Sequence, residues 1–297
     1  CKVWDLDGQE YTDMSIMGIG TNILGYSNSE VDNAVKDAVN KGNMSTFNCP
    51  EEVELAEKLI SMHSWADMAR FARSGGEANS IAIRIARAAT GKEKVAICGY
   101  HGWHDWYLAT NLENNNALKY HLLPGLDPNG VPPQLKGTVF PFRYNQFKEL
   151  NEIVKENNIG TIKMEVERNN PPEKQFLQKI RKLCDEKGIV LIFDECTSGF
   201  RETFGGLHKK YQVEPDIAMF GKAIGNGFAL TSIIGRKVIM EATQNTFISS
   251  TFWTERVGSV ASLKTLEIME RIESWKIITK QGQKIKKGWQ SIADSCG

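Results

Sequence analysis

Two hydrophobic patterns alternate along the middle of the chain. Short apolar runs bounded by Gly, Pro or Asn predict buried strands, and apolar residues spaced three and four positions apart predict helices. The strands are expected at 69–73, 95–98, 138–141, 161–166, 189–193, 217–220 and 232–235. The helices are expected at 31–40, from Pro50 onward, and at 78–89, 146–156, 175–187 and 256–271. This alternation predicts an α/β fold with a mainly parallel central sheet and flanking helices.

Two segments do not share this alternating pattern, one before it and one within it. The Asp7-Gly8 turn predicts a short hairpin near the start, and the Asn-, Pro- and Gly-rich stretch 111–134 predicts a long surface loop. We expect an N-terminal segment at 1–55 and a large cofactor-binding domain at 56–255. At 256–297 we expect an inter-domain helix and only the start of a small C-terminal domain. The ends suggest a fragment trimmed on both sides.

Composition narrows the classes of function. Lys plus Arg equals Asp plus Glu at 36 each, so no excess positive charge indicates a nucleic acid or an anionic membrane as partner. No apolar run approaches the length of a membrane-spanning helix. The six cysteines are scattered singly, which is typical of reduced thiols in a cytoplasmic enzyme.

Residues that could bind a ligand or take part in catalysis follow four of the predicted strands. Ser74-Gly75-Gly76 precedes a helix, where free N–H groups and the helix dipole favour an anion. Tyr100, Asp194 and Lys222 each follow another strand. Because ligands bind at the carboxyl ends of parallel strands, these residues are expected to share one site.

A nucleotide triphosphatase is the first alternative, since Asp194 at the end of an apolar run resembles a Walker B strand. That site also requires a GxxxxGK[ST] loop to bind phosphates. Neither Gly91-Lys92 nor Gly221-Lys222 has the earlier glycine, and neither lysine is followed by Ser or Thr. The sequence therefore disfavours this class.

Pyridoxal 5'-phosphate (PLP) needs the residue types that are present. A lysine binds its aldehyde as a Schiff base, and an aspartate keeps its ring nitrogen protonated so that the ring accepts electrons. A helix N-terminus binds its phosphate, and an aromatic side chain covers its ring. The sequence thus predicts a PLP site built from Lys222, Asp194, Ser74–Gly76 and Tyr100.

Three neighbouring groups have competing interpretations. His101, His104 and Asp105 form an HxxHD pattern, but Gly102 interrupts it and no third ligand cluster is evident, so no metal site is predicted. His101 is expected to line the cofactor pocket and His104 to be structural. Glu195 is expected to hydrogen-bond within the Asp194 loop. Arg201 either binds a substrate carboxylate or holds its loop.

Longer motifs add a family resemblance. The segments SGGEANSIAIRIARAATG, GYHGWHDW, LCDEKGIVLIFDECTSGFR and PDIAMFGKAIGNG resemble class III (fold type I) PLP-dependent aminotransferases, especially the glutamate-1-semialdehyde 2,1-aminomutase-like branch. The resemblance extends over almost the whole chain. It implies that Lys222 is the Schiff-base lysine and proton carrier, and that Asp194 is the partner of the ring nitrogen.

The resemblance also implies roles for less regular positions. Gly76 stands where relatives have a phosphate-binding threonine. Glu165 and Asn170 fall in the segment that reads roughly EPxxGN in relatives, which implies that Asn170 contacts the cofactor. Thr251 stands where a threonine reaches the phosphate in the neighbouring subunit, which implies a homodimer with a shared site.

Substrate contacts are expected from Glu165, Arg201 and Trp253. Bulky Phe252 and Trp253 replace the small residues of the aminomutases, which favours amino transfer from a small-molecule donor to a carbonyl acceptor. An intramolecular aminomutase (an isomerase) and a non-catalytic binding module are the alternatives.

Overall fold

A seven-stranded sheet forms the centre of the molecule. The structure, a computed structural model, describes residues 1–114, 116–121 and 126–296. The sheet order is β3-β9-β8-β7-β6-β4-β5. The strands are β3 (Met68–Ala72), β4 (Lys94–Cys98), β5 (Val139–Pro141), β6 (Ile159–Met164), β7 (Val190–Glu195), β8 (Ile217–Phe220) and β9 (Thr231–Gly235). Only β9 runs against its neighbours, so the predicted, mainly parallel sheet is confirmed.

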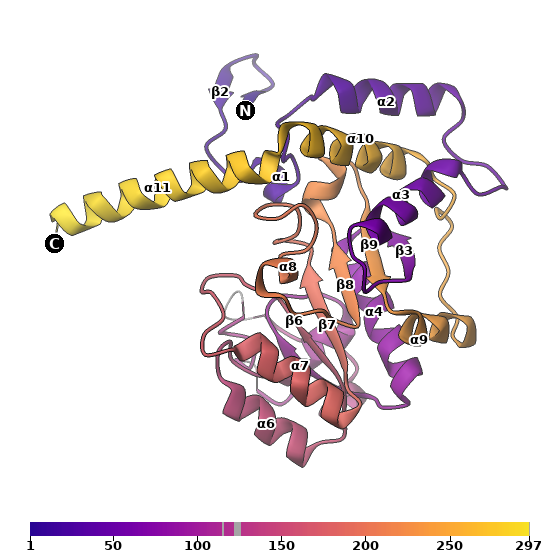
Figure 1. Cartoon of the computed structure of the whole chain (residues 1–297), viewed down its shortest axis with the longest axis vertical. Coiled ribbons are helices and arrows are strands. Elements are labelled where there is room, and N and C mark those ends of the chain that lie inside the picture. The colour runs from indigo at the N-terminus through magenta and orange to yellow at the C-terminus, as the bar shows by residue number, and fades with distance from the viewer. Residues whose placement is uncertain (115, 122–125, 297) are drawn as a thin grey trace.

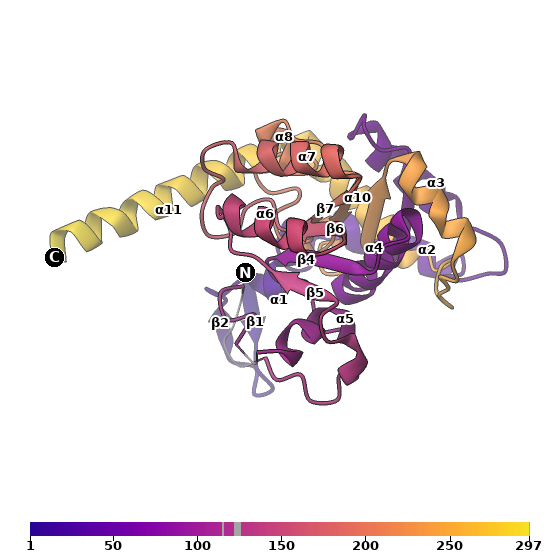
Figure 2. The ribbon, with the colours of Figure 1, turned by 90° about the horizontal axis from the view of Figure 1, so that it is seen from below.

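Helices cover both faces of this sheet. The longer ones are α2 (Ser29–Asn40), α3 (Pro50–Ser61), α4 (Gly75–Thr90), α6 (Phe147–Glu156), α7 (Phe176–Lys187), α10 (Val257–Ile272) and α11 (Ser274–Cys296). The one-turn helices are α1 (Met17–Gly20), α5 (Asp105–Leu108), α8 (His208–Tyr211) and α9 (Lys237–Met240). The short 3-10 helices are η1 (Ala109–Leu112), η2 (Pro133–Leu135), η3 (Lys222–Gly225) and η4 (Glu241–Asn245). Figures 1 and 2 show α6 and α7 on one face and α11 extending away from the body.

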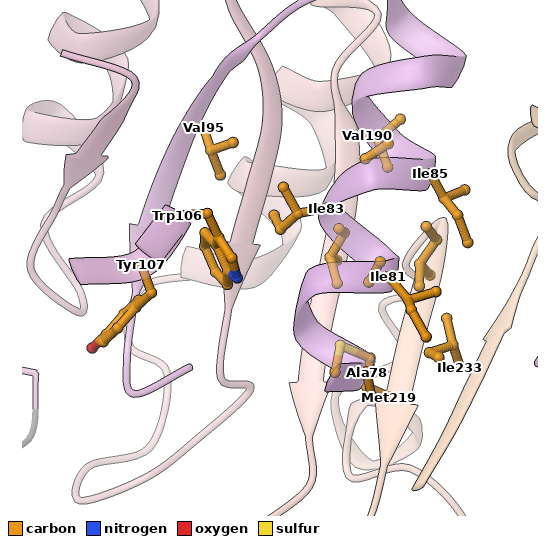
Figure 3. Close-up of a cluster of buried hydrophobic side chains, with 14 of the residues drawn as sticks. Ala78, Ile81, Ile83, Ile85, Val95, Trp106, Tyr107, Val190, Met219 and Ile233 are labelled. Atoms are coloured by element: carbon orange, nitrogen blue, oxygen red, sulfur yellow. The ribbon is translucent and has the colours of Figure 1, made fainter. Parts of the chain in front are cut away.

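Alternation along β7 decides which side chains meet which helices. Successive strand residues point to opposite faces. Val190 and Ile192 pack in the cluster on the α4 face, whereas Leu191 and Phe193 pack with α6 and α7. Figure 3 shows the first cluster, in which Ile81 and Ile85 of α4 lie against the strands. Asp194 therefore faces α4 and Glu195 faces the opposite layer.

Most predicted elements are confirmed, with shifted ends. The hairpin forms from β1 (Lys2–Trp4) and β2 (Glu10–Thr12), and Asn28 caps α2. The clearest correction is that Asp194 and Glu195 belong to β7 rather than following it. The predicted loop 111–134 is described only in part, since 115 and 122–125 lie outside the described residues. The division at 55 and 255 stays a prediction.

Helix α10 matches the helix predicted at 256–271, and α11 follows it along the chain. Apolar residues Ala261 and Ile268 of α10 pack on Val31 and Val35 of α2. Within the described part of the chain, no helix has the length and apolar character needed to cross a membrane.

Candidate active site

Asp194 forms the floor of the site at the carboxyl end of β7. It is 4% exposed, and its Oδ2 lies 2.9 Å from His101 Nδ1, while its Oδ1 accepts a hydrogen bond from the Cys196 amide. Burial alone would raise the pKa of Asp194, but nearby Lys163 and the His101 hydrogen bond hold it well below its usual range. Asp194 is therefore an anion at neutral pH.

His101 is neutral in this arrangement. Burial lowers its pKa, although the hydrogen bond to Asp194 works in the opposite direction. Because ionised Asp194 can only accept, His101 Nδ1 carries the proton and donates it. His101 thus orients the Asp194 carboxylate through this hydrogen bond.

Lys222 begins η3, directly after β8, which pairs with β7. Its backbone lies in the left-handed region with φ +44°, and its Nζ donates a hydrogen bond to Thr197 Oγ1 at 3.0 Å. Thr197 follows β7, so two adjacent strands together fix the position of the amine. The strand order places Lys222 and Asp194 at the same edge of the sheet.

The N-terminus of α4 supplies anion-binding groups at this edge. Ser74 is the N-cap, and its Oγ accepts from the Glu77 amide. Helix geometry leaves the N–H groups of Gly75 and Gly76 without intrahelical acceptors. Asn79 donates to the Gly75 carbonyl, and its buried Oδ1 has no hydrogen-bond partner among the described residues.

A cavity of about 230 Å³ joins these groups. It is lined by Gly75, Gly76, Asn79, Tyr100, Asp194 and Lys222, together with Thr197 and Thr231. Tyr100 is held from two sides, because its amide donates to Glu165 Oε2 at 3.1 Å and its ring packs edge-on against Tyr107. Ser74 caps the helix that starts here, and His101 lies beneath Asp194.

A larger cavity of about 950 Å³ lies at the opposite edge of the sheet, near Trp65, Arg181 and Asp216. Several of its charged side chains form ion pairs with one another, as in the 3.0 Å contact between Arg181 Nη1 and Asp216 Oδ2. Asp216 precedes β8, so this cavity lies at the amino end of the parallel strands, away from Lys222 and Asp194.

Other predicted site residues lie outside the cavity that holds Asp194 and Lys222. Glu165 and Asn170 line a separate cavity of about 130 Å³. Arg201 donates to the carbonyls of Thr197 and Gly20, at 2.5 and 2.6 Å, and so ties two loops together.

Thr251 and Trp253 lie in a turn that follows η4. Thr251 is exposed there. The Trp253 ring packs beside the Arg70 guanidinium at 4.5 Å. Their roles toward cofactor and substrate stay predictions.

With this geometry established, comparison with known proteins identifies the family. The family model described as Aminotransferase class-III matches residues 1–296. The chain belongs to the class-III aminotransferase family. The predicted family is therefore confirmed, and the reaction of that family is PLP-dependent transfer of an amino group.

Individual relatives show how far the similarity of this class-III chain extends. It is 34% identical to the 3-aminobutyryl-CoA aminotransferase of Cloacimonas acidaminovorans, over 100% of this chain and 70% of the relative. It is 32% identical to the glutamate-1-semialdehyde 2,1-aminomutase of Ignicoccus hospitalis, over 97% and 69%.

A solved structure, a PLP form of the FumI protein of Sphingopyxis sp. MTA144, is similar with a TM-score of 0.79 and 27% identity. That alignment covers 91% of this chain and 63% of FumI, so the chain spans less than two thirds of its length.

The family and the similarity to the PLP form of FumI confirm the predicted cofactor, and the cavity of this class-III chain fits PLP. It joins a buried anion at Asp194, an amine at Lys222 and the free amides of Gly75 and Gly76. The buried, unpartnered Oδ1 of Asn79 at the same place indicates a cavity built for a polar ligand.

Several residues in or near the cavity were not predicted from the sequence. Thr197 directly follows the DEC segment, and its proximity to Asp194 was a usable signal. Thr231 lies at the start of β9, and only the antiparallel pairing of β9 with β8 brings it to this edge. Lys163 does not line the cavity but contacts Asp194, and a charged residue within a buried strand was also a visible signal.

Glu195 needs a partial correction. One bond within its loop exists, from Ser198 Oγ at 3.4 Å. Its closer contacts lie on the opposite face of the sheet, where it binds the Leu207 amide and His208 Nδ1. His208 in turn accepts from Trp65 Nε1 at 3.0 Å, so Glu195 belongs to a buried structural network.

The glycine at position 76 is explained by packing. A Cβ built on Gly76 would lie 2.4 Å from His104 Cε1, and Gly102, at φ +96°, lets that loop approach the helix. The His104 ring thus fills the space in which a threonine side chain would begin. His104 therefore has the structural role that the sequence predicted.

Gly76→Thr is expected to destabilise the protein by about 1–3 kcal/mol, because overpacking forces the His104 ring to move. Urea unfolding of Gly76→Thr, His104→Ala and the double variant measures the coupling between the two positions. The double variant should recover most of the loss. Equal stability of Gly76→Thr and the wild type would show that His104 does not restrict position 76.

Proposed function

We propose that this chain catalyses PLP-dependent transfer of an amino group from a small-molecule amine or amino acid to a carbonyl compound. The observation that carries the proposal is the joint placement of Lys222 and Asp194 at the ends of adjacent strands. The N-terminus of α4 faces the same cavity. No other class of site weighed from the sequence requires all three features.

Lys222 would hold the cofactor through its amine and, when that amine is free, would take up and return a proton at the substrate carbon. The cofactor supplies the electron sink that makes this proton removable. The hydrogen bond to Thr197 Oγ1 restricts the amine of Lys222 to one side of the cavity. A positioned base of this kind avoids the cost of orienting a free amine.

The remaining contacts are proposed to orient the cofactor. Asp194, as a buried carboxylate, holds a proton on the ring nitrogen, and His101 orients it. The amides of Gly75 and Gly76 bind the phosphate, and Tyr100 covers the ring.

An intramolecular aminomutase is the second candidate. It is supported by the 32% identity to a protein named glutamate-1-semialdehyde 2,1-aminomutase. Nearly equal identity, 34%, to a named aminotransferase keeps transfer between two molecules as the first candidate.

The assembly and location are also proposals. Thr251 is exposed, on a turn that Arg73 anchors through the carbonyls of Phe252 and Glu255. An exposed but anchored turn supports a homodimer in which Thr251 reaches the partner's phosphate site. The six cysteines are all free thiols, which supports a cytoplasmic location.

Half-reaction spectroscopy tests the proposed function. Addition of an effective amino donor to the PLP-loaded protein, without acceptor, should remove the visible absorbance, and a keto acid should restore it. The donor panel should include 3-aminobutyryl-CoA, glutamate-1-semialdehyde and simple amino acids. Product from glutamate-1-semialdehyde without any acceptor would favour the aminomutase. A loaded protein whose spectrum responds to no donor would overturn catalysis.

A further inference from the structure

A lysine is buried in the middle of the sheet, directly beneath the proposed cofactor site. Lys163 lies on β6, paired with Ile97 on one side and Ile192 on the other. Its side chain is 0% exposed. Ile162 and Met164 pack in the α6–α7 layer, so alternation directs Lys163 to the α4 face with Asp194.

The contacts of Lys163 lead to Asp194. Its Nζ lies 3.6 Å from Asp194 Oδ2 and donates to Met219 Sδ at 3.0 Å. A thioether is a weak acceptor, so it does little to compensate a buried ammonium group. Asp194 is the ion-pair partner of Lys163 among the described residues. A buried charge persists only with such a partner.

Among the described residues, Lys163 is the lysine in contact with Asp194, because Lys222 donates to Thr197 instead. His101 is neutral because burial lowers its pKa, and the Cys196 thiol is neutral because burial raises its pKa well above the usual value. Glu165, at the end of β6, is already bound to Arg168 at 2.9 Å. The groups that face the pair are His101 after β4, Glu165 after β6, Cys196 after β7 and Lys222 after β8.

We propose that Lys163 is a positively charged positioning residue that keeps Asp194 ionised, so that the proton shared with PLP stays on the ring nitrogen. The inference rests on the proposed function. A cation in contact with a carboxylate favours the carboxylate over the acid. An ionised Asp194 is what the electron-accepting ring requires.

The competing interpretation is that Lys163 is an uncharged amine that fills space in the core and donates a hydrogen bond to Met219. Burial lowers the pKa of Lys163, and Asp194 only partly offsets this. The two interpretations differ in whether charge or hydrogen bonding at position 163 matters.

The test compares Lys163→Met, which removes charge and donor, with Lys163→Gln, which removes the charge and keeps a donor. The PLP dissociation constant is measured by fluorescence quenching between pH 8 and pH 5.5. Without Lys163, Asp194 should take up a proton in this range, so PLP affinity should fall about tenfold more than in the wild type, one pKa unit being a factor of ten. Both variants should behave alike.

Thr161→Val is the matched control, because Thr161 is buried on the same face of β6 and its hydroxyl has no partner among the described residues. The PLP dissociation constant of Thr161→Val should equal that of the wild type at every pH. A wild type that binds no PLP would refute the proposed function itself.

Two results would overturn the role of Lys163 alone. One is binding by both variants that parallels the wild type across the pH range. The other is a PLP dissociation constant that depends on pH as in the wild type for Lys163→Gln but not for Lys163→Met. If circular dichroism shows that neither variant folds, the ¹⁵N chemical shift of Nζ in the wild type decides. An ammonium at pH 7 supports the proposal, and an amine refutes it.

Discussion

Replacing Lys222 with alanine is expected to slow amino transfer by about 10³-fold or more, since a positioned acid–base group alone contributes 10²–10⁴-fold. The loss is large because one side chain supplies two functions, the amine that binds the aldehyde and the base that moves the proton. Thr197 would remain, but a hydroxyl substitutes for neither. Borohydride reduction and peptide mass spectrometry should find the cofactor attached to Lys222 in the wild type only.

Thr197→Val provides the control for Lys222→Ala. It keeps the amine and removes only the acceptor that Lys222 Nζ contacts. The loss of one hydrogen bond of about 1 kcal/mol corresponds to a roughly five- to tenfold lower rate, with the covalent attachment retained. A cofactor adduct in Lys222→Ala would refute the assignment of Lys222.

The fold was largely predictable because its strands are buried and short. The apolar run 217–220 matches β8 at both ends, and the run 95–98 differs from β4 by one residue at its start. Once strands and helices alternate, parallel pairing follows, and residues after different strands meet at one edge. That is how Lys222 and Asp194 could be placed together although 28 positions separate them.

The rest of the site depends on pairing between distant strands. Thr231 reaches the cavity because β9 runs antiparallel, which no local pattern in β9 indicates. Glu195 faces away because β7 extends through it, whereas the sequence places it in a loop. Lys163 contacts Asp194 only because β6 lies beside β7. Strand order is a long-range property, so these contacts needed the structure.

Asp194→Asn is expected to reduce activity strongly and to change how stability depends on pH. The amide cannot hold a proton on the cofactor ring, and Lys163 loses its ion-pair partner. Breaking a buried ion pair by removing one partner costs about 3–5 kcal/mol. Urea unfolding of the apoprotein at pH 7 should show a loss of this order.

The sign of the pH dependence follows from the two pKa shifts. The folded pKa of Asp194 lies below its unfolded value, so its stabilising contribution is present above pH about 4 and is lost as pH falls. In Asp194→Asn, Lys163 is expected to be a neutral amine when folded and an ammonium when unfolded. The unfolded state then binds more protons, so stability should rise by up to about 1.4 kcal/mol per pH unit until pH approaches 10.

The double variant Asp194→Asn with Lys163→Met separates charge from packing. It leaves neither ionisable group of the pair, so most of the stability lost in Asp194→Asn should return and the additional pH slope should disappear. Activity should not return, because the anion opposite the cofactor ring is still absent. A flat stability profile for Asp194→Asn, equal to the wild type from pH 6 to 9, would mean that no buried charge depends on Asp194.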